Sequence, residues 1–164
     1  MFTQMFRVDA KEIVNKSEHL EMVVPGTYRY LRNAFEPGLT VPQIKTLLDK
    51  HFLHMIRNTS LTPDGRLYES LMLILKNVGN LEVEDGLDTG ISSRHLRRLF
   101  EFYIGATAKS FSNVVRFQNV LKTARNHPGY LQERQFYDAG FFDQAHFIRD
   151  FKNFYGTTPG KAIL

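Results

Sequence analysis

A segment near the C-terminus repeats a pattern found 51 residues earlier, and this repeat limits the folds that the chain can adopt. The stretch GFFDQAHFIRDFKNFYGTTP, residues 140–159, aligns with the stretch that contains ISSRHLRRLFEFYIGAT, residues 91–107. Five of seventeen aligned positions are identical, where roughly one identity is expected by chance. The identical pairs are His95 and His146, Arg98 and Arg149, Phe100 and Phe151, Gly105 and Gly156, and Thr107 and Thr158. The chain therefore uses one local structure twice.

Each copy predicts a capped helix with one apolar face and one outward face. Ser92 and Asp143 stand at the predicted starts, because a side-chain oxygen there accepts free N–H groups of the first turn. The predicted buried residues are Leu96, Leu99, Phe100 and Tyr103 in the first copy, and Phe147, Phe151 and Phe154 in the second. The outward stripe, spaced i, i+3, i+4 and i+7, contains Arg94, Arg97, Arg98 and Glu101, and then Ala145, Ile148, Arg149 and Lys152. A short turn and another helical piece precede each copy, which is typical of two helix-turn-helix units.

The rest of the chain also predicts helices. Apolar residues recur at three and four positions in residues 40–56, 64–80 and 108–129, and alternating strand patterns are scarce. For residues 109–125 the predicted stripe is Phe111, Val114, Val115, Gln118 and Leu121. We expect an all-α fold with two helix-turn-helix subdomains joined by this long linker helix. Turn signals near residues 58–63 divide a helical N-terminal segment, residues 1–60, from a second domain, residues 61–164, that contains both helix-turn-helix units.

Positive charge is concentrated in one part of the chain. Residues 89–125 contain seven basic residues and one acid, a net +6, while the whole chain is +4 and the remainder is −2. A concentrated basic block suits a polyanion such as nucleic acid. A solvated helix face would give the same pattern, so charge alone leaves both interpretations open.

Several classes of site are disfavoured. The chain has no cysteine, which excludes disulfides, thiolate zinc sites and a cysteine nucleophile. No long apolar run or secretory signal is evident, so we expect a cytoplasmic protein. No phosphate-cradling glycine loop or nucleophile elbow is present, so we expect no enzymatic activity and no cofactor. His51 and His54 have a zinc-compatible spacing but no third ligand nearby. We interpret His95 and His146 as structural. The acids of residues 82–88 suit a helix start better than a catalytic pair.

Three motifs together resemble the DNA-binding domain of the AraC/XylS family of bacterial transcription regulators. They are S-x-R-H-L-x-R-x-F from Ser92, R-F-Q from Arg116, and G-F-F-D-Q-A-H-F-I-R-D-F-K-x-x-x-G-T-T-P from Gly140. The resemblance covers residues 81–163. It implies two helix-turn-helix units that bind adjacent major grooves of double-stranded DNA and often recruit RNA polymerase.

The resemblance also assigns roles to residues. The implied base-reading residues are Arg94, Arg97 and Arg98 in the first unit and Gln144, Ala145 and Arg149 in the second. Their chemistry fits, because arginine pairs with guanine, glutamine with adenine, and an apolar group contacts the thymine methyl. The predicted phosphate contacts are Lys109, Arg125 and Lys152.

Some positions depart from the family pattern. Gly86 stands inside the first supporting helix, at a cost of about 1 kcal/mol, and Phe136 and Val120 replace small residues. These departures leave an alternative function open, a helical protein-interaction module or co-regulator that kept the fold and lost specific DNA binding. Residues 1–60 are similar to the helical segment that often follows a sensor barrel in this family. We expect that segment to pair two chains as a homodimer or to cover the domain.

Overall fold

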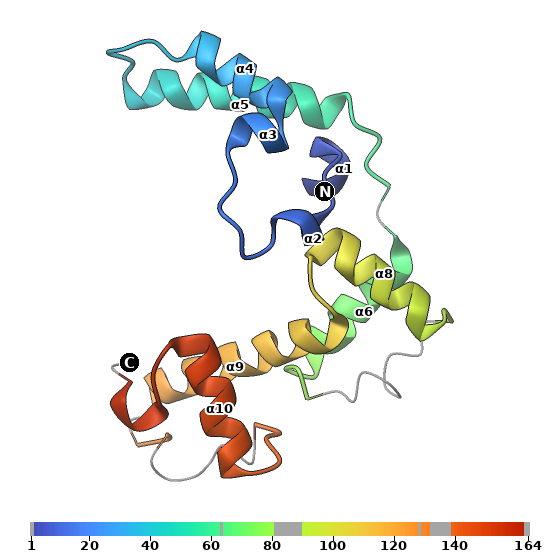
Figure 1. The fold of residues 1–164 in the computed structure, drawn as a ribbon, viewed down its shortest axis with the longest axis vertical. Coiled ribbons are helices and arrows are strands. Elements are labelled where there is room, and N and C mark those ends of the chain that lie inside the picture. Colours follow the sequence, from blue (N-terminus) through green and yellow to red (C-terminus); the bar gives the residue numbers. More distant parts are fainter. Residues whose placement is uncertain (1, 63, 81–89, 128, 132–138, 163–164) are drawn as a thin grey trace. The chain divides into compact units, whose positions relative to one another are not determined.

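The computed structural model of the chain describes residues 2–62, 64–80, 90–127, 129–131 and 139–162. Within these ranges the regular elements are helices, with no strand (Figure 1). The predicted all-α fold is therefore confirmed. No described helix is both long enough and apolar enough to cross a lipid bilayer. The contacts divide the chain into two compact units, one of residues 1–64 and 97–106, the other of residues 65–96 and 107–164.

The first unit is built from short N-terminal helices and a helical hairpin. Its helices are α1 (Phe2–Phe6), α2 (Ala10–Ile13), α3 (Leu20–Val23), α4 (Pro25–Ala34) and α5 (Val41–Arg57). Helices α4 and α5 lie side by side (Figure 1). The Tyr30 hydroxyl donates to the Leu47 carbonyl at 3.1 Å, and the Tyr30 ring stacks on His51. Helix α5 has Pro42 in its first turn, where a missing N–H and a fixed φ angle suit proline. None of its residues is fully buried.

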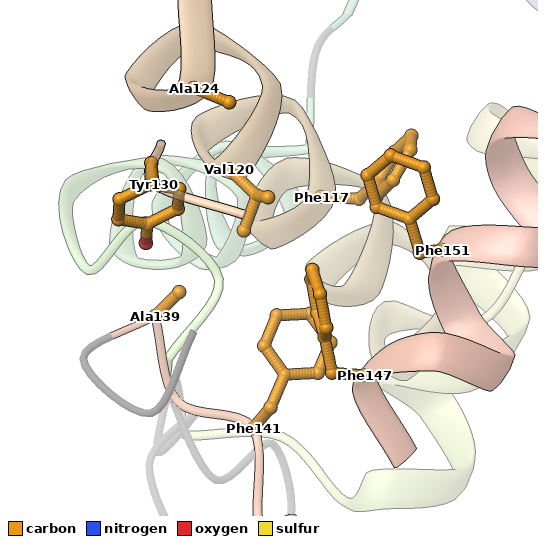
Figure 2. Close-up of a cluster of buried hydrophobic side chains, with 8 residues drawn as sticks. All are labelled: Phe117, Val120, Ala124, Tyr130, Ala139, Phe141, Phe147 and Phe151. Carbon is orange, nitrogen blue, oxygen red and sulfur yellow. The ribbon is translucent and has the colours of Figure 1, made fainter. Parts of the chain in front are cut away.

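The second unit has an aromatic core between two of its helices. Its elements are α6 (Gly65–Lys76), α9 (Ala108–Asn126), α10 (Gln144–Tyr155) and the 3-10 turn η2 (Pro159–Lys161). Helix α8 (Ser93–Ile104) begins in this unit, and its residues from 97 onward group with the first unit. The core cluster contains Phe117, Val120, Ala124, Tyr130, Ala139, Phe141, Phe147 and Phe151 (Figure 2). Phe154, which the repeat placed in this core, is 42% exposed and stacks over the Phe117 ring.

The buried face of the linker helix α9 differs from the predicted stripe. The buried residues are Ala108, Ser112, Phe117, Val120 and Ala124. Val114 is 39% exposed, and Gln118 is also exposed. The physical reason is that α9 contacts both α6 and α10, and small residues allow helices to approach closely. Alanine and serine have intermediate hydropathy, so a hydropathy pattern does not predict whether they lie on the buried or the exposed face of a helix.

Candidate nucleic-acid interface

Helix α8 presents its arginines to solvent. Arg94, Arg97 and Arg98 are all exposed, while Leu96 is 6% and Phe100 0% exposed. Burial of two apolar side chains on one face fixes the rotation of the helix about its axis. The three predicted base-reading arginines of the first helix-turn-helix unit are therefore available on the other face.

Helix α10 has the same division. The predicted base-reading residues Gln144, Ala145 and Arg149 are exposed, whereas Phe147 and Phe151 are 1% and 0% exposed. The Phe147 ring contacts the rings of Phe141 and Phe151, at centroid distances of 5.1 and 5.7 Å (Figure 2). The exposed face also carries Ile148 and Lys152. This face carries two cations, Arg149 and Lys152, against the three arginines of α8.

The two helices start and end alike. The side chains of Ser92 and Asp143 each accept the backbone N–H of the residue three positions later, at 3.3 and 2.6 Å. Gly105 and Gly156 follow the last helical turns with φ angles of 81° and 87°. A left-handed residue ends a helix, and glycine adopts that conformation without a steric penalty. The predicted caps and stops of the repeat are thus confirmed.

One of the α8 arginines takes part in an ion-pair network with the N-terminal segment. Arg97 Nε donates to Glu101 Oε1 at 2.9 Å, and Lys11 Nζ of α2 lies 3.7 Å from Glu101 Oε2. The hydrogen bond from Arg97 and the charges of both cations lower the pKa of Glu101. Helix α2 also touches the end of α8, because a Cβ on Gly105 would lie 2.9 Å from the Ala10 carbonyl oxygen.

The three predicted phosphate contacts are exposed. Lys109 lies in the first turn of α9, Arg125 in its last turn, and Lys152 in the last turn of α10. Exposed cations of this kind add affinity and salt dependence for DNA without reading its sequence.

Of the histidines singled out by sequence, His51 and His146 have side-chain contacts. His146 Nε2 lies 3.2 Å from Asp150 Oδ2 on the same helix, while His95 is exposed. His51 Nε2 lies 3.0 Å from the Thr27 hydroxyl, and burial together with the neighbouring His54 lowers the pKa of His51. The described part of the chain contains no group of three or more potential metal ligands.

Other sequence predictions fall outside the described residues. They are Gly86 in the predicted first supporting helix, the replacement Phe136, and the acids Glu82, Glu84, Asp85 and Asp88. Val120, the third departure from the family pattern, is fully buried in the core of the second unit.

Sequence reasoning missed two features of the second unit. Arg116 is half-buried, whereas the sequence analysis identified it only as the start of the R-F-Q motif and assigned it no buried position. It lies four residues from both Ser112 and Val120, which are buried, and this i±4 spacing is the signal that would have placed it inward. Phe142 is 86% exposed, directly before the start of α10. Its neighbour Phe141 is 4% exposed, and no sequence signal distinguishes the two rings.

The comparisons with known proteins agree with this arrangement. Residues 88–163 match the sequence model of a family described as a helix-turn-helix domain. No curated protein and no solved structure matches the chain significantly. The match covers both capped helices, the linker helix between them and the glycine stops. Residues 88–163 are therefore similar to a helix-turn-helix domain, which supports the resemblance to the AraC/XylS type of DNA-binding domain.

Proposed function

We propose that the chain is a sequence-specific transcription regulator whose helices α8 and α10 read adjacent major grooves of DNA. The single observation that supports this most strongly is the duplicated helix with one buried and one exposed polar face. The second helix of a helix-turn-helix unit lies in a major groove, and two such units can meet neighbouring grooves. Helix α9, with 19 residues, is about 28 Å long, comparable to one turn of DNA.

The proposed roles follow from side-chain chemistry. Arg94, Arg97 and Arg98 would read bases in the first groove, and Gln144, Ala145 and Arg149 in the second. Each good bidentate pair discriminates between bases by about 1–3 kcal/mol. Lys109, Arg125 and Lys152 would bind phosphates. The exposed face of α8 carries three arginines. We therefore expect the first helix-turn-helix unit to contribute more electrostatic affinity than the second helix-turn-helix unit.

We extend the proposal to the organisation of the whole chain. Residues 61–164 would act as the DNA-binding domain, and residues 1–60 as a linking or dimerising segment. The incompletely covered apolar face of α5 supports a role in pairing two chains. RNA polymerase would be the protein partner at the promoter, as in many regulators of this type.

The test separates base reading from phosphate binding. A preferred duplex is selected from random DNA, and binding to it is measured by fluorescence anisotropy over a salt series. Arg97→Ala should lose roughly 5- to 150-fold of preference at one base pair. Lys109→Ala should weaken binding to all duplexes alike and reduce the salt slope by about one. Lys50→Ala, which removes an exposed cation from α5, is the control for net charge.

Two outcomes contradict the proposal. If Arg97→Ala and Lys109→Ala changed binding in the same way for every sequence, the assigned roles would be wrong. Negligible DNA binding by the unmodified protein at low salt would favour the alternative function, a protein-interaction module.

A further inference from the structure

Arg116 of α9 binds the turn that leads into the second recognition helix. Its Nη1 donates to the Gly140 carbonyl at 2.6 Å, and its Nη2 donates to Asn113 Oδ1 at 2.7 Å. The guanidinium carbon lies 5.1 Å from the centroid of the Phe141 ring. One side chain therefore holds both the backbone of Gly140 and the ring of the next residue. A planar guanidinium with several donors makes such a combination possible.

The turn held by Arg116 is tightly constrained from another direction. Gly140 has a φ angle of 78°, and a Cβ at this position would lie 2.2 Å from Asn80 Oδ1. Gly140 is thus in close contact with Asn80 and also accepts a hydrogen bond from Arg116. A side chain at residue 140 would both strain the backbone and displace Asn80.

Phe141 transmits this position to the first turn of α10. Its ring is 4% exposed and lies 5.1 Å from the Phe147 ring (Figure 2). The His146 ring lies 5.6 Å away, between ring centroids. The N-cap Asp143 binds the N–H of His146 in the same turn. The exposed residues between Asp143 and His146 are Gln144 and Ala145. Their position therefore depends on where Phe141 is held.

The arrangement around Arg116 is costly for stability alone. Burial lowers the pKa of the guanidinium, an effect that the charge of Asp150 partly offsets. In the described structure its buried Nε has no hydrogen-bond partner. An apolar side chain of similar length would avoid both penalties, since replacing buried ionic groups with apolar ones is often neutral or stabilising. What the apolar side chain cannot supply is a fixed direction for the Gly140 carbonyl.

We propose that Arg116 is a positioning residue that sets the sequence preference of the second recognition helix, by holding Gly140 and Phe141 against the first turn of α10. This inference rests on the proposed function of α10. Arg116 itself would touch no base. Its effect on DNA would reach Gln144 and Ala145 through the Phe141 ring, and would be confined to the half-site that α10 reads.

The test compares Arg116→Met with Arg116→Lys and with Lys122→Met. Lys122 is exposed on the same helix, so Lys122→Met removes the same charge without touching the turn. Affinities are measured for the selected duplex and for duplexes with base changes in either half-site. Arg116→Met should lose about tenfold of preference in the α10 half-site and keep the preference in the α8 half-site. Arg116→Lys keeps one donor group for the Gly140 carbonyl, so its loss of preference in the α10 half-site should lie between those of the wild type and Arg116→Met. Lys122→Met should keep the preference in both half-sites.

Amide hydrogen exchange tests the same inference without DNA. Arg116→Met should speed the exchange of the His146 and Phe147 amides by roughly tenfold, while the α4–α5 hairpin is unchanged. The inference would be overturned if the His146 and Phe147 amides of Arg116→Met exchanged at the wild-type rate. It would also be overturned if Arg116→Met lost sequence preference in both half-sites together. So would an equal loss of affinity on all duplexes, which indicates a phosphate contact. If the wild-type protein showed no sequence preference, the proposed function would fail, and exchange alone would decide the role of Arg116.

Discussion

Three phenylalanines of the second unit should differ widely in their contribution to stability. Phe151 is 0% exposed and packs against the rings of Phe117, Phe147 and Tyr155 at 5.4, 5.7 and 5.2 Å. Truncation of a buried phenylalanine to alanine costs about 3–5 kcal/mol, from lost burial and from the cavity left behind. Because a small domain is stable by only about 5–15 kcal/mol, Phe151→Ala should remove a large part of that stability.

The other two positions provide matched comparisons. Phe154 is 42% exposed, so Phe154→Ala should cost about 1–2 kcal/mol. Phe142 is 86% exposed, and Phe142→Ala should cost less than about 0.5 kcal/mol.

Urea unfolding followed by far-UV circular dichroism measures all three costs, and hydrogen exchange in α10 assigns them to the second unit. Equal losses for Phe151→Ala and Phe154→Ala would refute the packing of α10 described here. They would instead support the pattern inferred from the repeat, in which both residues are buried alike.

Three further predictions concern single contacts. Asp143→Ala should destabilise the second unit by about 0.5–2 kcal/mol in urea unfolding, because the first turn of α10 loses its cap, whereas Asp143→Asn should keep most of that stability. Gly105→Ala should lower the free energy of unfolding by about 1–3 kcal/mol, because the added Cβ would lie 2.9 Å from the Ala10 carbonyl oxygen at a φ angle of 81°. The control is Gly160→Ala, where a Cβ would meet open space. Equal costs for the two variants would contradict the contact between Gly105 and Ala10. Lowering the pH below about 6.5 should destabilise the α4–α5 hairpin, because the pKa of His51 is lower in the folded chain, so the unfolded chain takes up the proton first. The pH dependence of the urea midpoint should be weaker in His51→Asn, and an unchanged dependence would count against this assignment.

The repeated helices were predictable because several local signals agree there. At α10, Asp143 supplies the cap, Phe147 and Phe151 supply the apolar face, and Gly156 supplies the stop. Each signal acts within a few residues of its position. A sequence pattern therefore contains the physical information that sets the helix bounds and its buried face.

The face of α9 was not predictable in the same way. Its burial depends on contacts with α6 and α10, and small residues such as Ser112 and Ala124 take part in those contacts. Arg116 is half-buried beside them and donates a hydrogen bond to the Gly140 carbonyl, which only the tertiary structure brings near. A hydropathy pattern assigns a charged residue to the outside, because it contains no information on distant partners.

The exposure of the α8 and α10 residues was expected from their spacing, but their roles on DNA depend on the spacing of the two helices. The account therefore depends most on the claim that both recognition helices bind one face of the duplex together. The direct measurement is the affinity for a selected site before and after insertion of about five base pairs, half a helical turn, between its two half-sites. The account predicts a fall of at least about tenfold, to the affinity of a single half-site. Unchanged affinity after the insertion would contradict it.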